Sequence, residues 1–306
     1  MDPIAKSLKK RSLSAKIETR GKLISLFCTL LIAALVIAIF GFIATKGLST
    51  FINDHGNLGE FLAGTTWSPD KTDSHGRILI GALPMIVGSF SVTFLSVLVA
   101  TPFAIAAAIF MTEISPDKGS KVLQPVIELL VGIPSVVYGF IGLAVIVPFV
   151  KSIFGGSGFG ILSGTLVLFV MILPTITSMT VDVLKTVPVY YREASLALGA
   201  TRWQTIYKVV LRAAAPGIMT AVIFGMSRAF GEALAVQMVI GNANLMPTSL
   251  ASPSTTLTSV LTMNMGNTVM GTTSNDALWS LALLLLLMSL IFNIIVKYIA
   301  KRGAMK

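Results

Sequence analysis

Charged residues are scarce in this chain of 306 residues. Asp, Glu, Lys and Arg together account for 12% of the sequence, whereas soluble domains average about 25%. Hydrophobic residues make up 54%. A soluble globular protein is therefore not expected, and the long uncharged segments have to be examined as membrane spans.

Cysteine and histidine are almost absent. Cys28, the one cysteine, lies in an apolar segment, which excludes disulfides and cysteine-based metal sites. His55 and His75 are the only histidines and share one polar loop, where solvated side chains are expected rather than a metal or catalytic centre. The Gly-x-x-x-x-Gly-Lys-Ser/Thr phosphate-binding loop, His-Glu-x-x-His and Gly-x-Ser-x-Gly are also missing. We therefore expect neither an enzyme nor a chain that binds a cofactor itself.

Six segments are long and apolar enough to cross a bilayer, which requires about 20 residues of helix. The second is too short for two crossings and a turn, so we expect one long helix with Pro84 and Pro102 as the places where it can bend. Glu128 interrupts the third segment, and Arg228 and Glu232 lie within the fifth. The sequence thus predicts an all-α membrane protein with six transmembrane helices. The segments are 23–44, 78–112, 121–151, 161–181, 216–240 and 277–296.

The spans also divide the chain into units. The basic N-terminal segment is expected to be a disordered anchor rather than an amphipathic helix lying on lipid. In the last outer loop, residues 256–270 are expected to form a short surface or re-entrant helix. The predicted units are the N-terminal segment 1–22, the first span 23–45, an external loop 46–77, a core 78–299 that includes the loop 185–212, and a tail 300–306.

Basic residues exceed acidic ones, with 23 Lys and Arg against 13 Asp and Glu and a net charge of +10. In a soluble protein this excess would suggest nucleic-acid binding. With six spans, however, most basic residues fall in the two termini and in the loops on the same side of the membrane. By the positive-inside rule that side is the cytoplasm, so both termini are expected there and nucleic acid is not expected as a partner. The exceptions are Lys46, Lys71, Arg77, Lys151 and Arg228.

The loop 185–212 is predicted to contain two short helices. The first begins near Pro188, a residue favoured in the first helical turn. It ends at Leu198, before Gly199, because glycine commonly follows a helix C-terminus. Thr201 and Gln204 have the spacing of a capping box that starts the second helix. Such a pair is either an ordinary amphipathic connector or a rigid docking element for a cytoplasmic partner.

This loop resembles the EAA loop of permeases from binding-protein-dependent ABC importers. The resemblance rests on Glu193-Ala194-Ser195, on Gly199 and on the Val-Val-Leu sequence at 209–211. Ser195 stands where the family has a second Ala, and the later family Pro is replaced by Arg. The resemblance implies that the first short helix is the coupling helix, which sits on the ATP-hydrolysing subunit. The residues implied at this contact are Glu193, Ala194, Ser195, Gly199 and Ala200.

Other segments extend the resemblance over most of the chain. Residues 60–69, 127–139 and 228–236 are similar to the phosphate-transporting permeases of this superfamily, which have the MetI-like fold. The resemblance implies one half of a heterodimeric pore in the bacterial plasma membrane. It also implies three partners: a second permease subunit, an extracytoplasmic phosphate-binding protein, and a homodimeric cytoplasmic ATPase that binds ATP and Mg²⁺.

Two opposite charges lie inside the predicted fifth span. Arg228 and Glu232 are four residues apart, so an unbroken helix would place them on one face. A charge near the bilayer centre costs about 2.5–3.5 kcal/mol on insertion scales. The pair is therefore either a structural ion pair, or Arg228 binds an oxyanion in the substrate path while Glu232 weakens that binding for release. Glu128, near the cytoplasmic start of the third span, is a further candidate for the path.

Three other functions fit parts of this pattern. A permease of the same superfamily could carry a different oxyanion, such as sulfate or molybdate. An ion-coupled secondary carrier would transport without an ATPase and is favoured by an inverted repeat, which the sequence lacks. A membrane-embedded assembly protein would show no transport after reconstitution.

Overall fold

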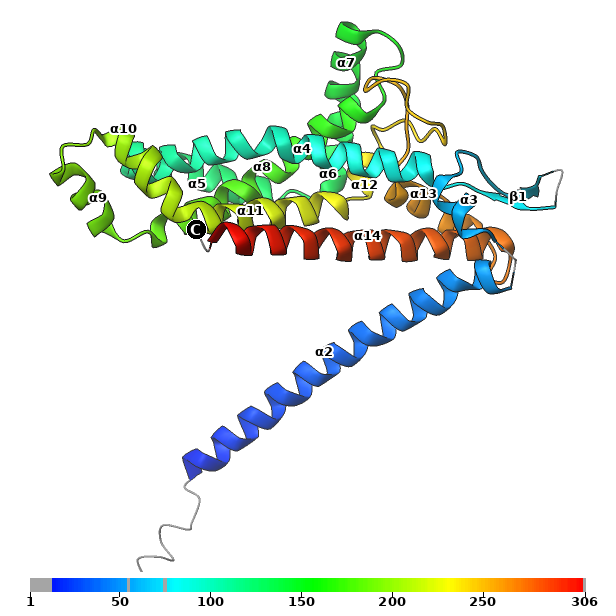
Figure 1. Cartoon of the computed structure of the whole chain (residues 1–306), viewed down its shortest axis with the longest axis horizontal. Helices are drawn as coiled ribbons and strands as arrows, with labels where there is room; N and C mark the ends of the chain where they lie inside the picture. Colours follow the sequence, from blue (N-terminus) through cyan, green and yellow to red (C-terminus); the bar gives the residue numbers. More distant parts are fainter. Residues whose placement is uncertain (1–12, 54–55, 74–75, 305–306) are drawn as a thin grey trace, which may run out of the picture.

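The computed structural model describes residues 13–53, 56–73 and 76–304, and most of them are helical (Figure 1). Six helical stretches in this part of the chain are long and apolar enough to cross a membrane, which confirms the predicted number. The chain is therefore a helical membrane protein. The stretches are Glu18–Ile52, Leu83–Ile114, Ser135–Phe154, Ile161–Thr186, Arg202–Phe230 and Thr273–Ile295.

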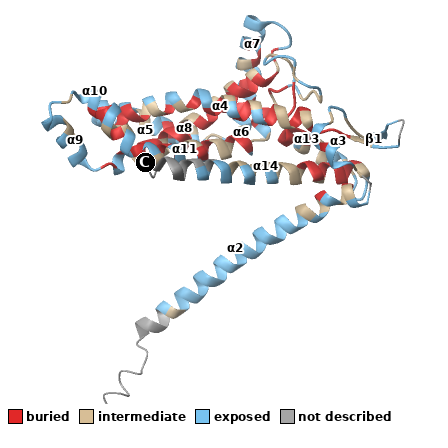
Figure 2. Cartoon of the chain, viewed as in Figure 1, coloured by how far each residue is buried: buried red, intermediate tan, exposed pale blue. Residues whose placement is uncertain are grey.

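The first helix, α2 (Leu13–Ile52), extends away from the helix bundle and is exposed over most of its length (Figures 1 and 2). Only its C-terminal end packs against the bundle, where it contacts α14 (Thr273–Ala304). Ser280 Oγ donates to the Gly47 carbonyl at 2.7 Å, and a Cβ at Gly47 would lie 2.6 Å from Leu283 Cβ. The expected disordered anchor is wrong from Leu13 onward, since that part continues the helix; residues 1–12 lie outside the described ranges.

Helices α4 (Leu83–Ile109) and α8 (Ile161–Thr186) form the centre of the bundle. Ala100, Ala104 and Ala108 are buried one turn apart on α4, and such small residues let helices approach closely in a membrane. The predicted single long helix is confirmed: α4 runs through Pro102 and continues into the π-helical turn η1 (Phe110–Ile114).

Helix α11 (Leu211–Phe230) packs against α8 through glycine. A Cβ at Gly217 would lie 2.4 Å from Val183 Cγ1, and one at Gly225 would lie 2.5 Å from Ile176 Cγ1. Contacts this short leave no room for a side chain. The α8–α11 interface therefore depends on these two glycines, and α14 covers the outer side of α11.

The predicted third span, 121–151, is wrong at its start. Residues of α5 (Pro116–Gly132) form a separate amphipathic helix, and the span consists of α6 (Ser135–Ile141), the π-turn η2 (Gly142–Ile146) and α7 (Val147–Phe154). Pro134 separates the two because Ile133 before it is extended, as residues before proline generally are.

The predicted fifth span, 216–240, is wrong at both ends. The helical stretch begins earlier, with α10 (Arg202–Thr205) and the π-turn η3 (Ile206–Val210), and α11 already ends at Phe230. Glycine at 231 and the short helix α12 (Leu234–Gln237) follow. Apart from Arg228 and Glu232, the composition stays apolar through the break, so composition overstated the length of the helix.

Small elements lie at the end of the bundle opposite α9 (Figure 1). They are α3 (Leu58–Ala63), the antiparallel hairpin of β1 (Trp67–Thr72) and β2 (Ile78–Ile80), α13 (Leu257–Asn264) and the 3-10 turn η4 (Met265–Asn267). The helix expected within 256–270 is confirmed, and a capping box of Thr256 and Ser259 starts it. The hairpin was not predicted.

Replacing Gly225 by Val should weaken the α8–α11 interface. The added carbons would overlap Ile176, and overpacking of this kind costs about 1–3 kcal/mol. We expect a lower midpoint of thermal unfolding in detergent and less folded protein in the membrane. Gly21→Val is the control, because no atom lies within 4 Å of a Cβ there. Equal unfolding midpoints for the two variants would contradict the packing role.

Candidate functional site

The loop 185–212 forms one end of the molecule, with α9 (Val189–Ala197) at its tip (Figure 1). Helix α9 follows Pro188, and Gly199 adopts φ +81°, a left-handed conformation that glycine tolerates best. Thr201 accepts from the Gln204 amide, and the Gln204 side chain accepts from the Thr201 amide at 2.9 Å. The two predicted helices and the capping box are thus confirmed.

The loop exposes large apolar side chains. No residue of α9 is buried, and Leu198 just after it is 89% exposed. Tyr190, Trp203 and Tyr207 are each about 60% exposed. Clustered exposed apolar groups of this kind mark contact sites for another protein or for lipid, so the loop has the composition of a docking surface.

The residues implied by the EAA resemblance lie in two environments. Glu193, Ala194 and Gly199 are exposed, and Ser195 and Ala200 are half-buried. The Ser195 and Thr205 hydroxyls are hydrogen-bonded at 2.9 Å and connect α9 to α10. Among the described residues Glu193 has no hydrogen-bond or ion-pair partner, so its carboxylate is available to a second protein.

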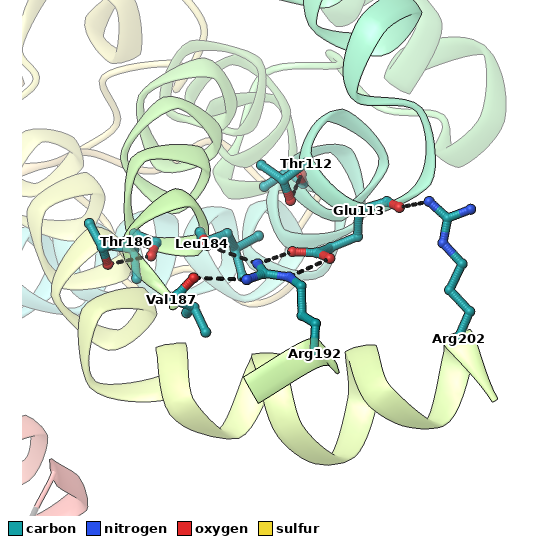
Figure 3. A network of polar contacts seen from close by, with 9 residues as sticks. Thr112, Glu113, Leu184, Thr186, Val187, Arg192 and Arg202 are labelled. Atoms are coloured by element: carbon teal, nitrogen blue, oxygen red, sulfur yellow. Dashed lines mark hydrogen bonds and ion pairs between the residues drawn. The ribbon is translucent and has the colours of Figure 1, made fainter. Parts of the chain in front are cut away.

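Sequence reasoning missed the acidic partner of this loop. Glu113, in η1, forms an ion pair with Arg192 of α9 at 2.5 Å, the single salt bridge within the described ranges (Figure 3). In the sequence, Glu113 was considered only as the charged residue that follows the second uncharged segment. A carboxylate at the end of a span that faces a basic loop was the available signal, but the sequence did not say which arginine it would meet.

Arg228 lies in the last turn of α11 and is half-buried. Its Nη1 donates to Thr175 Oγ1 of α8 at 2.7 Å. Arg228 has no carboxylate partner in the part of the chain that the structure describes. The guanidinium therefore has a neutral partner, Thr175, and no acidic partner among the described residues.

Of the two alternatives for Arg228 and Glu232, the structure does not show the ion pair. The helix ends before Glu232, so the two residues do not share a helical face. Glu232 Oε1 instead accepts from the Ala235 amide at 3.2 Å and caps α12. Glu232 also lines a small polar cavity with Ser89 and Thr258, and its own carbonyl accepts from Thr258 Oγ1 at 2.9 Å.

Glu128, the third candidate for the path, lies on α5 rather than in a span. Its side chain is exposed, and Oε1 accepts from Gln124 Nε2 at 2.9 Å. An exposed position on an amphipathic helix removes the cost of burying its charge in the bilayer. Within this single chain the structure does not bring Glu128 together with Arg228 by any hydrogen bond or ion pair of the described residues.

Comparison with known proteins assigns the family. Residues 100–304 match the family described as "Binding-protein-dependent transport system inner membrane component". The probable ABC transporter permease protein YqgH of Bacillus subtilis is 54% identical over 93% of this chain and 91% of its own length. The phosphate transport system permease protein PstC of Mesorhizobium japonicum is 34% identical over 79% of this chain and 78% of its own.

Solved structures show the same fold at low identity. A chain of the bacterial alginate ABC transporter, in complex with an alginate-bound periplasmic protein, has a TM-score of 0.64 and 15% identity. The alignment covers 95% of this chain and 98% of that one. A chain of the inward-facing MetNI methionine ABC transporter has a TM-score of 0.55 at 19% identity, over 73% of this chain and 94% of that one.

The chain therefore belongs to the binding-protein-dependent ABC transporter permeases and has their MetI-like helical fold. Members of this family are membrane components and not enzymes, and ATP is hydrolysed by a separate subunit. The match covers α8 to α14 as well as the loop 185–212, so both candidate regions lie inside the family's common part.

Replacing Gly199 by Val should loosen the turn between α9 and α10. A left-handed conformation costs a residue with a Cβ roughly 1–2 kcal/mol, and Gly199 has φ +81°. We expect faster amide hydrogen exchange in 189–205 with little change in the overall unfolding midpoint. Ala197→Val, at an exposed helical position, is the control. Unchanged exchange in Gly199→Val would show that the turn does not depend on glycine.

Proposed function

We propose that this chain is one of the two permease subunits of an ATP-driven importer of inorganic phosphate. The observation that carries the proposal is Arg228, a cation in a membrane-spanning helix whose hydrogen-bond partner is the neutral hydroxyl of Thr175. The PstC proteins among its relatives support phosphate as the substrate. The relative at 54% identity has a generic permease name, so it supports the class of transporter and not the substrate.

The chemistry of Arg228 suits a tetrahedral oxyanion. A guanidinium presents several donors in a plane and can bind two oxygens of phosphate at once. Thr175 occupies one donor at 2.7 Å and orients the group, while a neutral partner leaves the positive charge uncompensated. A passing anion would offset the cost of this charge in the membrane.

The two acidic candidates have different places in this proposal. Glu232 accepts from the Ala235 amide at the start of α12, and its negative charge near the path would limit how tightly an anion is retained. Glu128 lies exposed on α5, so it would line the path only if the second permease subunit closes the path around it.

The partners follow from the family and from the exposed loop. We infer a PstA-like second permease, a homodimeric PstB-like ATPase that binds ATP and Mg²⁺, and an extracytoplasmic PstS-like phosphate-binding protein. The ATPase would contact α9 and the turn that follows it, through Glu193, Ala194, Ser195, Gly199 and Ala200. This arrangement puts both termini in the cytoplasm and the complex in the bacterial inner membrane, and closure of the ATPase dimer would move α9 as a lever.

Replacing Arg228 should reduce phosphate uptake without loss of assembly. A charge-assisted hydrogen bond contributes about 1.5–3 kcal/mol, so initial uptake below saturation should fall roughly 10- to 100-fold in Arg228→Ala. Arg228→Lys keeps the charge but loses the planar fork, and we expect an intermediate rate. Uptake of radiolabelled phosphate into cells that rely on this complex measures the effect. Arg20→Lys, exposed on α2, is the control, and normal uptake by an assembled Arg228→Ala complex would reject the role.

Removing the carboxylate of Glu193 should uncouple ATP hydrolysis from transport. The side chain is exposed and has no partner in the described part of the chain, so Glu193→Gln should leave the fold intact. We expect ATPase activity to persist while its stimulation by the loaded binding protein falls severalfold, measured on the purified complex. Glu18→Gln on the exposed surface of α2 provides the matched control. Full stimulation in Glu193→Gln would place the coupling contact elsewhere.

A further inference from the structure

Glu113 joins two parts of the molecule that lie far apart in the sequence. It is 9% exposed and ends the long α4–η1 helix. Its carboxylate accepts from Arg192 of α9 twice, from Nη2 at 2.5 Å and from Nε at 3.1 Å (Figure 3). A two-point contact between an arginine fork and a carboxylate fixes orientation as well as distance.

The two arginines of the loop bind more than the carboxylate. Arg192 Nη1 donates to the Val187 carbonyl at 2.8 Å, just beyond the end of α8. Arg202, at the start of α10, donates to the carbonyl of Glu113 (Figure 3) and also to that of Ile114. These cations satisfy carbonyls at helix C-termini, where positive charge is favourable. We call the contacts of Glu113 with Arg192 and Arg202 the clasp.

Packing of buried apolar side chains does not hold α9 against the bundle. No residue of α9 is buried. The nearby buried apolar cluster includes Ala108, Val187 and Ile206 but no residue of α9. A cavity of about 520 Å³ lies beneath the helix and is lined by Glu113, Arg192, Leu196 and Arg202 among others. Besides the chain connections, the polar contacts that hold the described α9 to the bundle are the Ser195–Thr205 hydrogen bond, the Arg192 hydrogen bonds to the carbonyls of Leu184 and Val187, and the ion pair of Arg192 with Glu113.

We propose that Glu113 is a positioning residue that transmits the motion of α9 directly to α4. The chain connects α9 to α8 on one side and to α10 on the other, but Glu113, in the turn that continues α4, is 79 residues away in sequence from Arg192. This pair resists separation because Glu113 is buried and an unpaired buried charge is costly, so a displaced α9 draws η1 with it. Glu113 itself lies in η1, the π-helical turn that continues α4. Such turns are frequent at functional sites.

The inference rests on the proposed function only in assuming that an ATPase subunit docks on α9. Glu113→Gln tests it, because the amide keeps the shape of the side chain but removes the negative charge and replaces one of the two oxygens that accept from Arg192 with an NH2 donor. Asp117→Asn is the matched control: the same chemical change at an exposed carboxylate on neighbouring α5. Both variants are studied in the complete complex, reconstituted with its ATPase, second permease and binding protein.

The first readout is the number of ATP molecules hydrolysed per phosphate imported. We expect this ratio to rise about fivefold or more in Glu113→Gln, the lower end of typical coupling between sites, and to stay at the wild-type value in Asp117→Asn. A merely structural role would lower the amount of assembled complex and leave the ratio per complex unchanged. That outcome would overturn the proposal.

The second readout does not depend on the substrate. Trapping the ATPase with ADP and vanadate should change amide hydrogen exchange in both α9 and η1 of the wild type. In Glu113→Gln the change in α9 should persist, and the change in η1 should be lost. An unaltered η1 response in the variant would reject the clasp as the route. If the wild type failed to import phosphate, the proposed substrate would be wrong while this readout would still decide the role of Glu113.

A second pair of variants covers a failure of Glu113→Gln to assemble. Arg192→Lys keeps the positive charge at α9 but replaces the fork with a single point of contact. We expect assembly with an intermediate ATP-to-phosphate ratio and a weakened response of η1. Lys185→Arg, exposed at the end of α8, is its control. A wild-type ratio in assembled Arg192→Lys would overturn the proposal.

Discussion

The low polarity of the bilayer interior is the constraint on which the rest of this structure depends. Backbone groups inside it must bond within the chain, so each crossing is a helix, and charged side chains are costly there. The sequence satisfies both conditions with six long apolar helices. Where the backbone departs from a regular helix, other groups satisfy it: Glu232 caps α12 after the break at 231, and Tyr138 donates to the Leu130 carbonyl at 2.7 Å beside the break at Pro134.

Against that constraint, Arg228 and Glu113 stand out for opposite reasons. Arg228 keeps its charge uncompensated among the described residues and has a neutral hydroxyl beside it, which is an arrangement suited to a mobile anion. Glu113 is almost fully buried but tightly paired, which is an arrangement suited to a permanent mechanical joint. The first is placed where the helices α8 and α11 meet, and the second where the exposed loop meets α4.

The sequence predicted the number of spans and the two helices of the loop because both depend on local composition. Uncharged length identifies a crossing, and Pro188, Gly199 and the Thr201–Gln204 capping box define helix ends within a few residues. The helix ends near Pro134 and at 231 were not predicted because most residues around them are apolar, and Glu232 just after the second break was taken to continue the helix. The alternative of an Arg228–Glu232 ion pair is not seen, since it assumed a helix that continues unbroken to Glu232.

The clasp could not be predicted for a different reason. Glu113 and Arg192 are brought together by the packing of α4 on α8 and by the turn at Pro188, and no sequence period connects residues so far apart. The loop has five basic residues between 185 and 212, so charge alone left several partners open for Glu113. The residues of the docking loop, by contrast, were identified through their resemblance to the EAA loop.

The most direct test of the account is phosphate uptake by proteoliposomes that contain the purified complex, with ATP supplied on the ATPase side. We predict uptake that requires both ATP and the phosphate-loaded binding protein and that excess sulfate does not reduce. Uptake that persists without ATP would contradict an ABC importer, and equal competition by sulfate would contradict phosphate as the substrate selected by this permease.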